Sequence, residues 1–413
     1  MGQTNEHTPM WRHRILILII GCLLPLLPLA AQNGTSSPYS AFAFGDINDN
    51  VPNTYRAMGE VGIGMRSNKV INPMQPASYT ACDSLTFMFD VAAAVSWSHY
   101  ADAAGVANKA NGNLEYLAMQ FPLWKRYIAF SAGLIPFSAK GYNITGRDSI
   151  RSAYHYTTAY QGSGGISQVY GGLSFNICDW VALGANIYYM FGQSVDLHTL
   201  TFDEAGLSPV IQGVYTEVSS VRLRYGMQLF HDFGGHAFSL GAVFENKARL
   251  HSSEIIYEST FNDTVSVKDG FHTPLAYGVG ASYTWANRLT VAFDYMHQDW
   301  ASAEFLTLTG YMTNRDKYAL GIEYRHNPMG RNYAERVRWR LGANVVDNYI
   351  PDVKQPDFTV TLGVGLPLRT VATVFNASLE YTHRGGDKMM QENMLKLTIN
   401  AAISENWFFK RKL

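Results

Sequence analysis

Residues 275–285 read Leu-Ala-Tyr-Gly-Val-Gly-Ala-Ser-Tyr-Thr-Trp, and large apolar side chains alternate there with small or polar ones. Because a β-strand points successive side chains to opposite faces, this stretch has one apolar face and one face of small or polar groups. The same alternation recurs through most of the chain after residue 31, without helical segments between the repeats. Repeated strands of this kind predict an antiparallel sheet that closes around a lumen, with lipid outside.

Fourteen alternating segments can be delimited in the sequence. They lie at residues 84–98, 113–124, 126–144, 164–177, 180–202, 214–233, 236–259, 271–285, 288–302, 314–327, 336–350, 357–369, 371–384 and 392–404. An even number of strands is typical of bacterial outer-membrane barrels. The predicted fold class is therefore all-β, a 14-stranded antiparallel transmembrane β-barrel.

The connections between these segments alternate between short and long. Tight turns are predicted at 124–125, 178–179, 234–235, 286–287 and 370, and longer polar connections at 99–112, 145–163, 203–213, 260–270 and 303–313. Outer-membrane barrels have short periplasmic turns and longer outer loops, so the long connections are assigned to the outside. The 328–335 connection is an inner turn of unusual length.

The tryptophans fall near the predicted strand ends. Trp124, Trp180, Trp285, Trp339 and Trp407 lie at inner ends, and Trp97 and Trp300 lie near outer ends. Indole rings favour the membrane–water interface, so the two sets predict an aromatic girdle at each rim. A soluble β-sandwich with these rings in its core is the alternative, which the number of strands and the rim positions disfavour.

The first 31 residues have the features of a targeting sequence. A basic stretch at 11–14 precedes an apolar run at 15–29, which predicts a signal peptide cleaved before Gln32 and a location in the outer membrane of a Gram-negative bacterium. A lipobox-like sequence ending at Cys22 is a competing interpretation. Acylation there would leave an apolar linker exposed to solvent, so cleavage before Gln32 is preferred.

The composition excludes several classes of function. The formal net charge is −1 and no basic stripe is present, which argues against a nucleic-acid partner. Beyond the signal peptide only Cys82 and Cys178 remain; unpaired thiols are favoured over one disulfide in an oxidising envelope. No nucleophile elbow, zinc motif or phosphate loop occurs, and His251 and Ser252 fall on opposite faces of one strand. The sequence predicts no catalytic residue, no metal and no cofactor.

The predicted inward face carries charges of both signs. They are Asp294, Arg222, Arg224, Glu245, Glu323, Arg325, Arg338, Arg340, Glu380 and Lys396. Such charges are expected to pair with one another or with a segment that fills the lumen.

The segment at 32–83 lacks any long alternating stretch. Glycines recur between 55 and 64, and prolines between 71 and 79, so the segment is suited to pack closely against the inner wall as a plug or hatch. The predicted organisation is a signal peptide at 1–31, a hatch at 32–83, a barrel at 84–404 and a short periplasmic tail at 405–413.

The motif in this segment resembles a known family. The stretch Ala57-Met58-Gly59-Glu60-Val61-Gly62-Ile63-Gly64, followed by Asn72-Pro73 and Pro76-Ala77-Ser78-Tyr79, resembles the hatch motif of the FadL-type outer-membrane transporters, and more narrowly their Bacteroidetes-type subfamily with its PorV-like relatives. The usual contiguous Asn-Pro-Ala is split in this chain. The resemblance marks as hatch residues Met58, Gly59, Gly62, Gly64, Asn72, Pro73, Pro76 and Ala77.

The resemblance also implies a route for ligands. In that family hydrophobic molecules leave sideways into the bilayer where the third strand kinks. The third strand here contains Pro136, which lacks an N–H for the ladder and implies a bulge or a break. Gly133, Pro136 and Gly141 are therefore the candidate lateral opening, and a bulge that only bends the strand is the alternative.

Three hypotheses of function follow. The favoured one is transport of hydrophobic or amphipathic, fatty-acid-like small molecules, with outer-membrane lipid and the ligand as partners; it predicts an apolar pocket near the outer rim. The alternative is a PorV-like carrier barrel that binds secretion-system proteins. An enzyme acting on membrane lipid would need a nucleophile and a base at the rim, and the sequence nominates neither.

Overall fold

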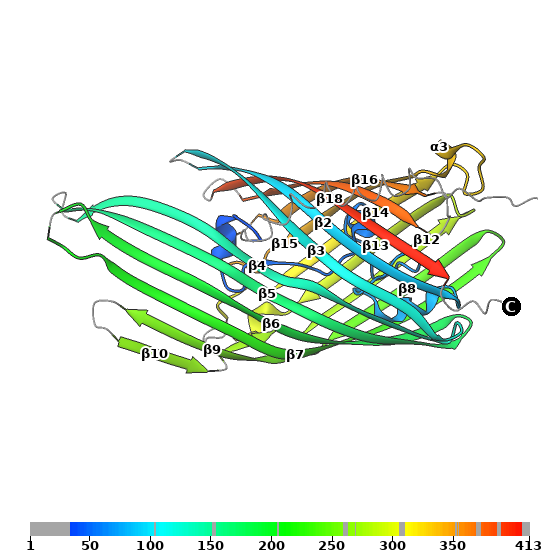
Figure 1. Cartoon of the computed structure of the whole chain (residues 1–413), viewed down its shortest axis with the longest axis horizontal. Coiled ribbons are helices and arrows are strands. Elements are labelled where there is room, and N and C mark those ends of the chain that lie inside the picture. Colours follow the sequence, from blue (N-terminus) through cyan, green and yellow to red (C-terminus); the bar gives the residue numbers. More distant parts are fainter. Residues whose placement is uncertain are drawn as a thin grey trace, which may run out of the picture.

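The structure is a computed structural model that describes residues 34–102, 105–150, 154–204, 206–258, 263–268, 270–304, 310–351, 353, 355–368, 373–385 and 390–406. The predicted signal peptide, Trp407 and the end of the tail lie outside these residues. The described chain forms one antiparallel sheet that curves into an elongated barrel, and the N-terminal segment lies inside it (Figure 1).

The barrel wall has 14 strand positions, as predicted. In chain order they are β2 (Thr86–Ala101), β3 (Val106–Trp124), β4 (Ile128–Ile150), β5 (Tyr154–Cys178), β6 (Val181–Phe202), β7 (Val210–Phe233), β8 (His236–Glu245) continued by β9 (Ala248–Glu258), β11 (Phe271–Thr273) continued by β12 (Ala276–Trp285), β13 (Leu289–Gln298), β14 (Arg315–Arg325), β15 (Arg338–Asp347), β16 (Asp357–Pro367), β17 (Val374–Arg384) and β18 (Gln391–Asn406). The sheet closes because β18 pairs with β2 along its whole length.

Two of the predicted strands are interrupted, which corrects their predicted bounds. The strand expected at 236–259 breaks between β8 and β9, and the one expected at 271–285 breaks at Pro274, between β11 and β12. Proline cannot donate a ladder hydrogen bond, so a break at this position has a direct cause. A further strand, β10 (Asp263–Lys268), pairs with β9 inside the connection predicted at 260–270.

The predicted outer loops differ from the structure more than the predicted strands do. Most of the predicted loop at 145–163 belongs to β4 and β5, and residues 210–213 of the one at 203–213 belong to β7; the pairing continues to Ile150↔Tyr154 and Leu200↔Val210. Beyond the lipid a strand needs ladder hydrogen bonds but no apolar face, so polar segments extend the sheet without alternating. These strands project past the rest of the barrel (Figure 1).

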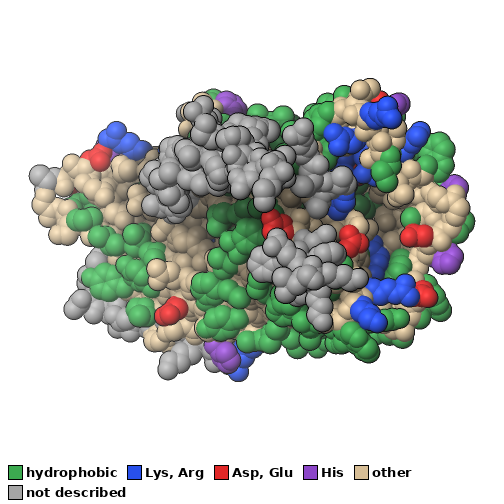
Figure 2. Space-filling view, turned by 45° about the vertical axis from the view of Figure 1, so that its right-hand side comes forward, with side chains coloured by type: hydrophobic (Ala, Val, Ile, Leu, Met, Phe, Trp, Pro, Cys, Tyr) green, Lys and Arg blue, Asp and Glu red, His purple; other side chains and the backbone are tan. Residues whose placement is uncertain are grey.

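The outward face of the wall is apolar and the tryptophans lie mainly on it. Trp97, Trp124, Trp180, Trp285 and Trp339 are all exposed. Figure 2 shows apolar side chains over the middle of the visible face.

Trp300 departs from the predicted outer girdle, because it lies in the short helix η5 (Trp300–Ser302) and is 1% exposed. Its ring packs against Phe44 and Tyr349, and its Nε1 donates to Gln298 Oε1 at 2.9 Å. The ring therefore covers the N-terminal segment instead of facing the membrane interface.

Several of the inward charges form ion pairs, as expected. Arg222 and Arg224 both bind the carboxylate of Glu245, and Arg340 binds Glu323 at 2.7 Å. Each of these arginines is at least 95% buried. Cys82 and Cys178 are unpaired thiols, so no disulfide joins them.

The N-terminal plug, defined here as residues 34–83, fills the lumen beside these charges. Its regular elements are η3 (Pro38–Ala41), β1 (Asp46–Ile47), α2 (Asn53–Arg56) and η4 (Pro76–Ala81). Fully buried apolar side chains of the plug pack on the inner wall: Ala57, Met58, Val61, Ile63, Ala77 and Tyr79. The only other α-helix in the described chain, α3 (Tyr333–Arg336), lies between β14 and β15. No helix of the described residues is long and apolar enough to cross a membrane.

The closed ladder predicts heat-dependent electrophoretic mobility. An unboiled sample in sodium dodecyl sulfate should migrate as a compact species and a boiled sample should shift to its full mass, because a barrel without free edges resists the detergent until it is heated. Gel electrophoresis of purified protein with and without boiling checks this. Identical mobility in both lanes would contradict the closed barrel.

Candidate functional site

Met58 and Gly59 lie directly on the backbone of the barrel wall. A Cβ added at Gly342 would lie 2.0 Å from the Gly59 nitrogen, and one at Gly321 would lie 2.2 Å from the Met58 carbonyl oxygen. Gly59 has a φ of 71° and donates its N–H to Thr361 Oγ1 at 2.8 Å. Glycines on the wall and a glycine in the plug are therefore both required for this approach.

Asp294 on β13 binds the next part of the hatch motif. Its carboxylate accepts the backbone N–H groups of Gly62 at 2.5 Å, Ile63 at 2.7 Å and Gly64 at 3.2 Å. Three successive N–H groups that converge on one anion form a concave backbone nest. Asp294 is 3% exposed, so this bond is shielded from water and ties the plug to the wall.

Asn72 and Pro73 extend the anchoring. Asn72 Nδ2 donates to the carbonyl of Gly62 at 2.8 Å, which links the two halves of the motif. The Pro73 carbonyl accepts from Asn186 Nδ2 and from the Tyr188 hydroxyl, both at 3.0 Å. The motif residues are therefore held by side chains of the wall.

Pro76 and Ala77 begin the helix η4 against a second pair of wall glycines. A Cβ at Gly184 would lie 2.5 Å from the Pro76 carbonyl carbon, and one at Gly226 would lie 2.8 Å from Pro76 Cδ. Gln75 caps the helix, since its Oε1 accepts the Ala77 N–H at 3.3 Å. All eight predicted hatch residues thus lie in the lumen.

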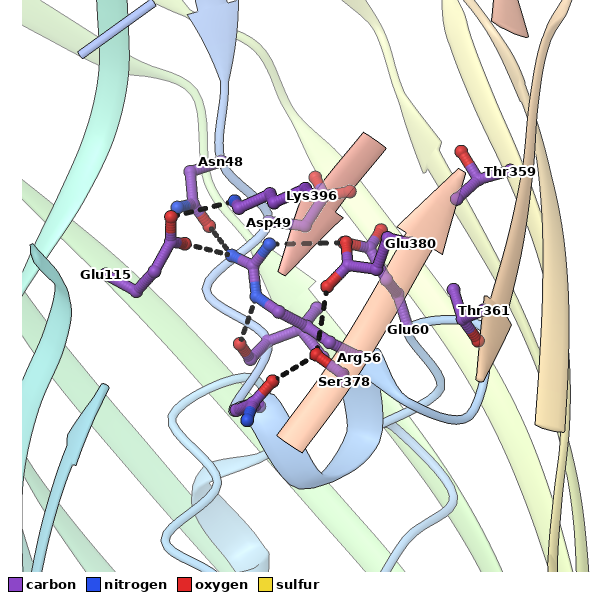
Figure 3. A network of polar contacts seen from close by, with 12 residues as sticks. Asn48, Asp49, Arg56, Glu60, Glu115, Thr359, Thr361, Ser378, Glu380 and Lys396 are labelled. Carbon is purple, nitrogen blue, oxygen red and sulfur yellow. Dashed lines mark hydrogen bonds and ion pairs between the residues drawn. The ribbon is translucent and has the colours of Figure 1, made fainter. Parts of the chain in front are cut away.

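Arg56 is the centre of a polar network that the sequence did not indicate (Figure 3). Its Nη2 donates to Asn48 Oδ1 at 3.0 Å and pairs with Glu115 Oε2 at 3.2 Å. The other oxygen of Glu115 pairs with Lys396 Nζ at 2.8 Å, and Glu60 lies 3.6 Å from Arg56 Nη1. The network joins the plug to β3 and β18.

Asp49 forms a second buried network. Arg315 binds both of its oxygens, at 2.8 and 2.9 Å, and Lys317 Nζ lies 2.7 Å from Oδ2 and 2.5 Å from Glu60 Oε2. Burial alone would raise the pKa of the Asp49 carboxyl, but the charges of Arg315 and Lys317 outweigh it and hold the pKa well below its usual range. Asp49 therefore stays ionised and paired.

The ladder between β3 and β4 is incomplete. The two strands pair from Trp124↔Ile128 up to Leu117↔Leu134 and no further. Gly133 lies inside the paired part, opposite Ala118.

Bulges mark both sides of the point where pairing stops. The β4–β5 register shifts between Pro136 and Ser138, which leaves Phe137 as a bulge residue. On β3, Glu115 is the residue without a partner on β2. The sequence left open whether Pro136 causes a bulge or a break, and the structure has both at this position. We call the part of the wall beyond Leu134, where β4 no longer pairs with β3, the wall gap.

The plug lies along the gap. β1 pairs with the free edge of β4 through Asp46↔Ala139 and Ile47↔Ser138. Ser40 Oγ lies 3.0 Å from the nitrogen of Gly141 and 3.1 Å from its carbonyl oxygen. Gly141, the third residue of the candidate opening, is therefore bound to the plug.

A cavity of about 600 Å³ lies between the plug and the wall. Its lining includes Gly112–Glu115 of β3, Pro136, Ser138 and Ala139 of β4, Gly34, Asp46 and Ile47 of the plug, and charged residues of β16, β17 and β18. The cavity is therefore polar and charged on one side, in contrast to the apolar pocket expected from the sequence.

The cavity presents charged and hydrogen-bonding side chains to any molecule that enters it. Among the residues that the structure describes, no three His, Cys, Asp or Glu side chains are grouped to hold a metal ion. The sequence placed Glu380 and Lys396 on the inner face but gave no reason to join them to Asp49, Arg56 and Glu60. Asp49 and Glu60 bind Arg315 and Lys317, which lie far away in the sequence, and Arg56 binds Glu115 on β3, so no local pattern marks these plug residues.

A sequence profile of the BamG family matches residues 10–413. The chain belongs to the BamG family. No curated protein matches the sequence of this BamG-family chain.

Solved structures share the fold of this BamG-family barrel at low sequence identity. A Pseudomonas aeruginosa FadL homologue matches with a TM-score of 0.62 at 12% identity, over 88% of this chain and 100% of that one. The CymD monoaromatic hydrocarbon channel matches at 0.56 and 12%, over 88% and 99%. The Ralstonia pickettii toluene transporter TbuX matches at 0.56 and 14%, over 84% and 96%. The FadL-type barrel predicted from the sequence is therefore confirmed as the fold.

Removal of the Asp294 carboxylate should loosen the plug without opening the barrel. Asp294→Ala leaves three buried N–H groups without an acceptor, which should lower the free energy of unfolding by about 3 kcal/mol. Urea unfolding measures that loss, and limited trypsin digestion should cut after Arg66 or Lys69 faster than in the parent. Asp347→Ala, at an exposed carboxylate on β15, is the control. Equal stability and equal cleavage in both variants would contradict the anchoring role.

Proposed function

We propose that this barrel transports hydrophobic or amphipathic, fatty-acid-like small molecules across the outer membrane, and that they leave sideways through the wall gap. One observation carries the proposal: the cavity is lined by both strands that flank the gap and by the plug segment that closes it. A molecule in the cavity is separated from the outside of the wall by residues 34–48 of the plug.

The two parts of the plug are held by different kinds of contact, which supports a hatch that moves only in part. Residues 58–77 are tied to the wall by Asp294, by Asn186 and by backbone contacts with wall glycines. Residues 37–47 pair with β4 through the two residues of β1 and are further held by the Arg384–Asp46 ion pair at 2.8 Å and by the packing of Phe44 on Trp300. Release of this part therefore breaks a two-residue ladder, at about 1 kcal/mol net for each hydrogen bond, together with these side-chain contacts.

The character of the cavity favours amphipathic ligands over purely apolar ones. Leu114, Pro136, Ala139 and Ile47 give it an apolar side at the gap, and charged side chains line the opposite side. Burial of an alkyl chain contributes about 25 cal/mol per Å². A polar head group would remain in contact with the charged side.

A disulfide across β1 and β4 should block transport. Ile47→Cys with Ser138→Cys, in a background of Cys82→Ser and Cys178→Ser, places the thiols on directly paired residues. Oxidation should reduce uptake of a fluorescent fatty acid at least tenfold in cells that rely on this protein, and reduction should restore it, because β1 can no longer leave the gap.

The matched control is Val291→Cys with Ile322→Cys, a directly paired couple of β13 and β14 away from the gap. It should form a disulfide without loss of uptake. Full uptake by the oxidised β1–β4 variant would refute exit through the gap.

A second candidate is a PorV-like carrier barrel that binds secretion-system proteins. The observation that favours it is the sheet of β4 to β7, which projects beyond the barrel (Figure 1). Crosslinking in whole cells followed by mass spectrometry should then recover secreted or secretion-apparatus proteins on this sheet. Their absence, together with uptake that depends on the gap, would leave transport as the function.

A further inference from the structure

The connection between β14 and β15 is an inner turn of unusual length. It comprises residues 326–337, contains the short helix α3, and stands out beyond the strands at the upper right of Figure 1. None of its residues lines the cavity. The turn is therefore placed to meet something outside the barrel.

The turn and the strand ends beside it carry an excess of positive charge. Residues 285–288 and 323–338 contain five arginines and two glutamates, an excess of three positive charges. Figure 2 shows Lys and Arg side chains gathered at this end of the barrel. We call the five arginines the basic patch: Arg288, Arg325, Arg331, Arg336 and Arg338.

Arg325 joins the turn to the neighbouring turn between β12 and β13. Its Nη2 donates to the carbonyl of Asn287 at 2.8 Å, and its N–H donates to the carbonyl of Arg288 at 2.7 Å. In the β14–β15 ladder Arg325 lies directly opposite Arg338. Like charges that face each other across two strands repel, so an anion at this place would be stabilising.

The two glutamates leave the patch positive. Glu323 is shared between Arg338 at 3.5 Å and Arg340 at 2.7 Å. Glu335 accepts from Asn332 Nδ2 at 2.9 Å and from Asn327 Nδ2 at 3.4 Å, inside the turn.

Arg331 is the most accessible charge of the turn. It is exposed, and among the residues that the structure describes it forms no ion pair. Glu335 is directed away from it, toward Gly330, where an added Cβ would lie 2.1 Å from Glu335 Oε2. Arg331 can therefore bind an outside anion without first losing a partner.

Exposed apolar side chains accompany these charges. Met329 is 92% exposed and Tyr333 is 48% exposed. The guanidinium carbon of Arg336 lies 5.6 Å from the centroid of the Tyr333 ring, so the charge and the ring form one surface. Basic residues mixed with exposed apolar ones are typical of segments that bind an anionic membrane surface.

Two indoles place the patch at the level of the lipid headgroups. Trp339 directly follows Arg338 and is 60% exposed on the outer face of the wall. Trp285 is 53% exposed, and its carbonyl accepts the N–H of Arg288 at 2.8 Å. Exposed indoles at strand ends mark the membrane–water interface, so the arginines next to them lie where headgroups lie.

We propose that the basic patch binds the headgroups of anionic phospholipids in the inner leaflet of the outer membrane. Arg331 and Arg336 bind the phosphate oxygens, for which the guanidinium fork is well suited. Met329 and Tyr333 contact the acyl chains next to the headgroups. This site is independent of transport, because it shares no residue with the cavity or the plug.

Two phospholipids with the same acyl chains test the charge preference. Phosphatidylglycerol, which is anionic, and phosphatidylcholine, which is zwitterionic, are titrated into the purified full barrel in a nonionic detergent, and bound lipid is counted by native mass spectrometry. Phosphatidylglycerol should bind about tenfold more tightly. Equal affinity for the two lipids would overturn the inference.

Charge-neutral variants test the residues. Arg331→Gln combined with Arg336→Gln should weaken phosphatidylglycerol binding about tenfold, and Arg331→Gln alone about threefold, with phosphatidylcholine binding unchanged in both. Lys125→Gln is the matched control, because Lys125 is an exposed cation in the inner turn between β3 and β4, away from the patch. It should bind like the parent. Unchanged phosphatidylglycerol affinity in Arg331→Gln and in the double variant would refute the site, and the single variant remains informative if the double one does not fold.

Two competitors distinguish a lipid from other anions. Neither inorganic phosphate nor a peptide of glutamates should displace phosphatidylglycerol at equal concentration, because neither supplies the acyl chains that Met329 and Tyr333 contact. Displacement by phosphate would overturn the lipid as the ligand. Binding of the peptide without any preference for phosphatidylglycerol would also overturn it, and would assign the patch to an acidic protein.

Discussion

Inside a bilayer every backbone N–H and C=O must find a partner within the protein, and this constraint governs the rest of the structure. The closed ladder of the described strands meets much of this demand, but beyond Leu134 the strand β4 loses β3 as a neighbour. β1, Asn48 and Ser40 supply the missing partners, through pairing with Ser138 and Ala139 and through bonds to Phe137 and Gly141. The plug is therefore part of the barrel wall as well as its filling.

The position of the plug accounts for the other unusual features of the lumen. The plug backbone runs along the inner surface of the wall. It lies in direct contact with the wall backbone where both have glycines, at Gly59 of the plug against Gly321 and Gly342 of the wall. Charged side chains of the wall are then buried, and they are satisfied by partners on the plug such as Asp49 and Arg56. The cavity is the space left between these contacts, and the same charged side chains line it.

Much of the fold could be predicted from the sequence, because alternation reports which face of a strand meets lipid. The number of wall strands and the exposed Trp124, Trp180 and Trp339 follow from that pattern. The prediction failed for segments outside the bilayer, where the outward side chains need not be apolar. Polar segments outside the bilayer extend β4 to β7, and Trp300 packs on the plug because a ring near the rim can face either side.

The site was less predictable than the fold. The glycines and prolines of the hatch motif were recognisable because close backbone contact restricts residue type. Asp294 was placed on the correct face, but its role depends on the backbone of Gly62 to Gly64, which only the folded barrel brings to it. Asp49 and Arg56 lie in a segment without periodicity, so nothing local distinguishes them from solvated charges.

The central claim is that the plug completes the wall at β4. Hydrogen–deuterium exchange with mass spectrometry on the purified barrel tests it most directly, by comparing the full protein with one that lacks residues 34–52. The account predicts that amides around Ser138–Gly141 lose protection in the deletion, while those of β13 keep theirs. Equal protection of the Ser138–Gly141 amides in both proteins would contradict it.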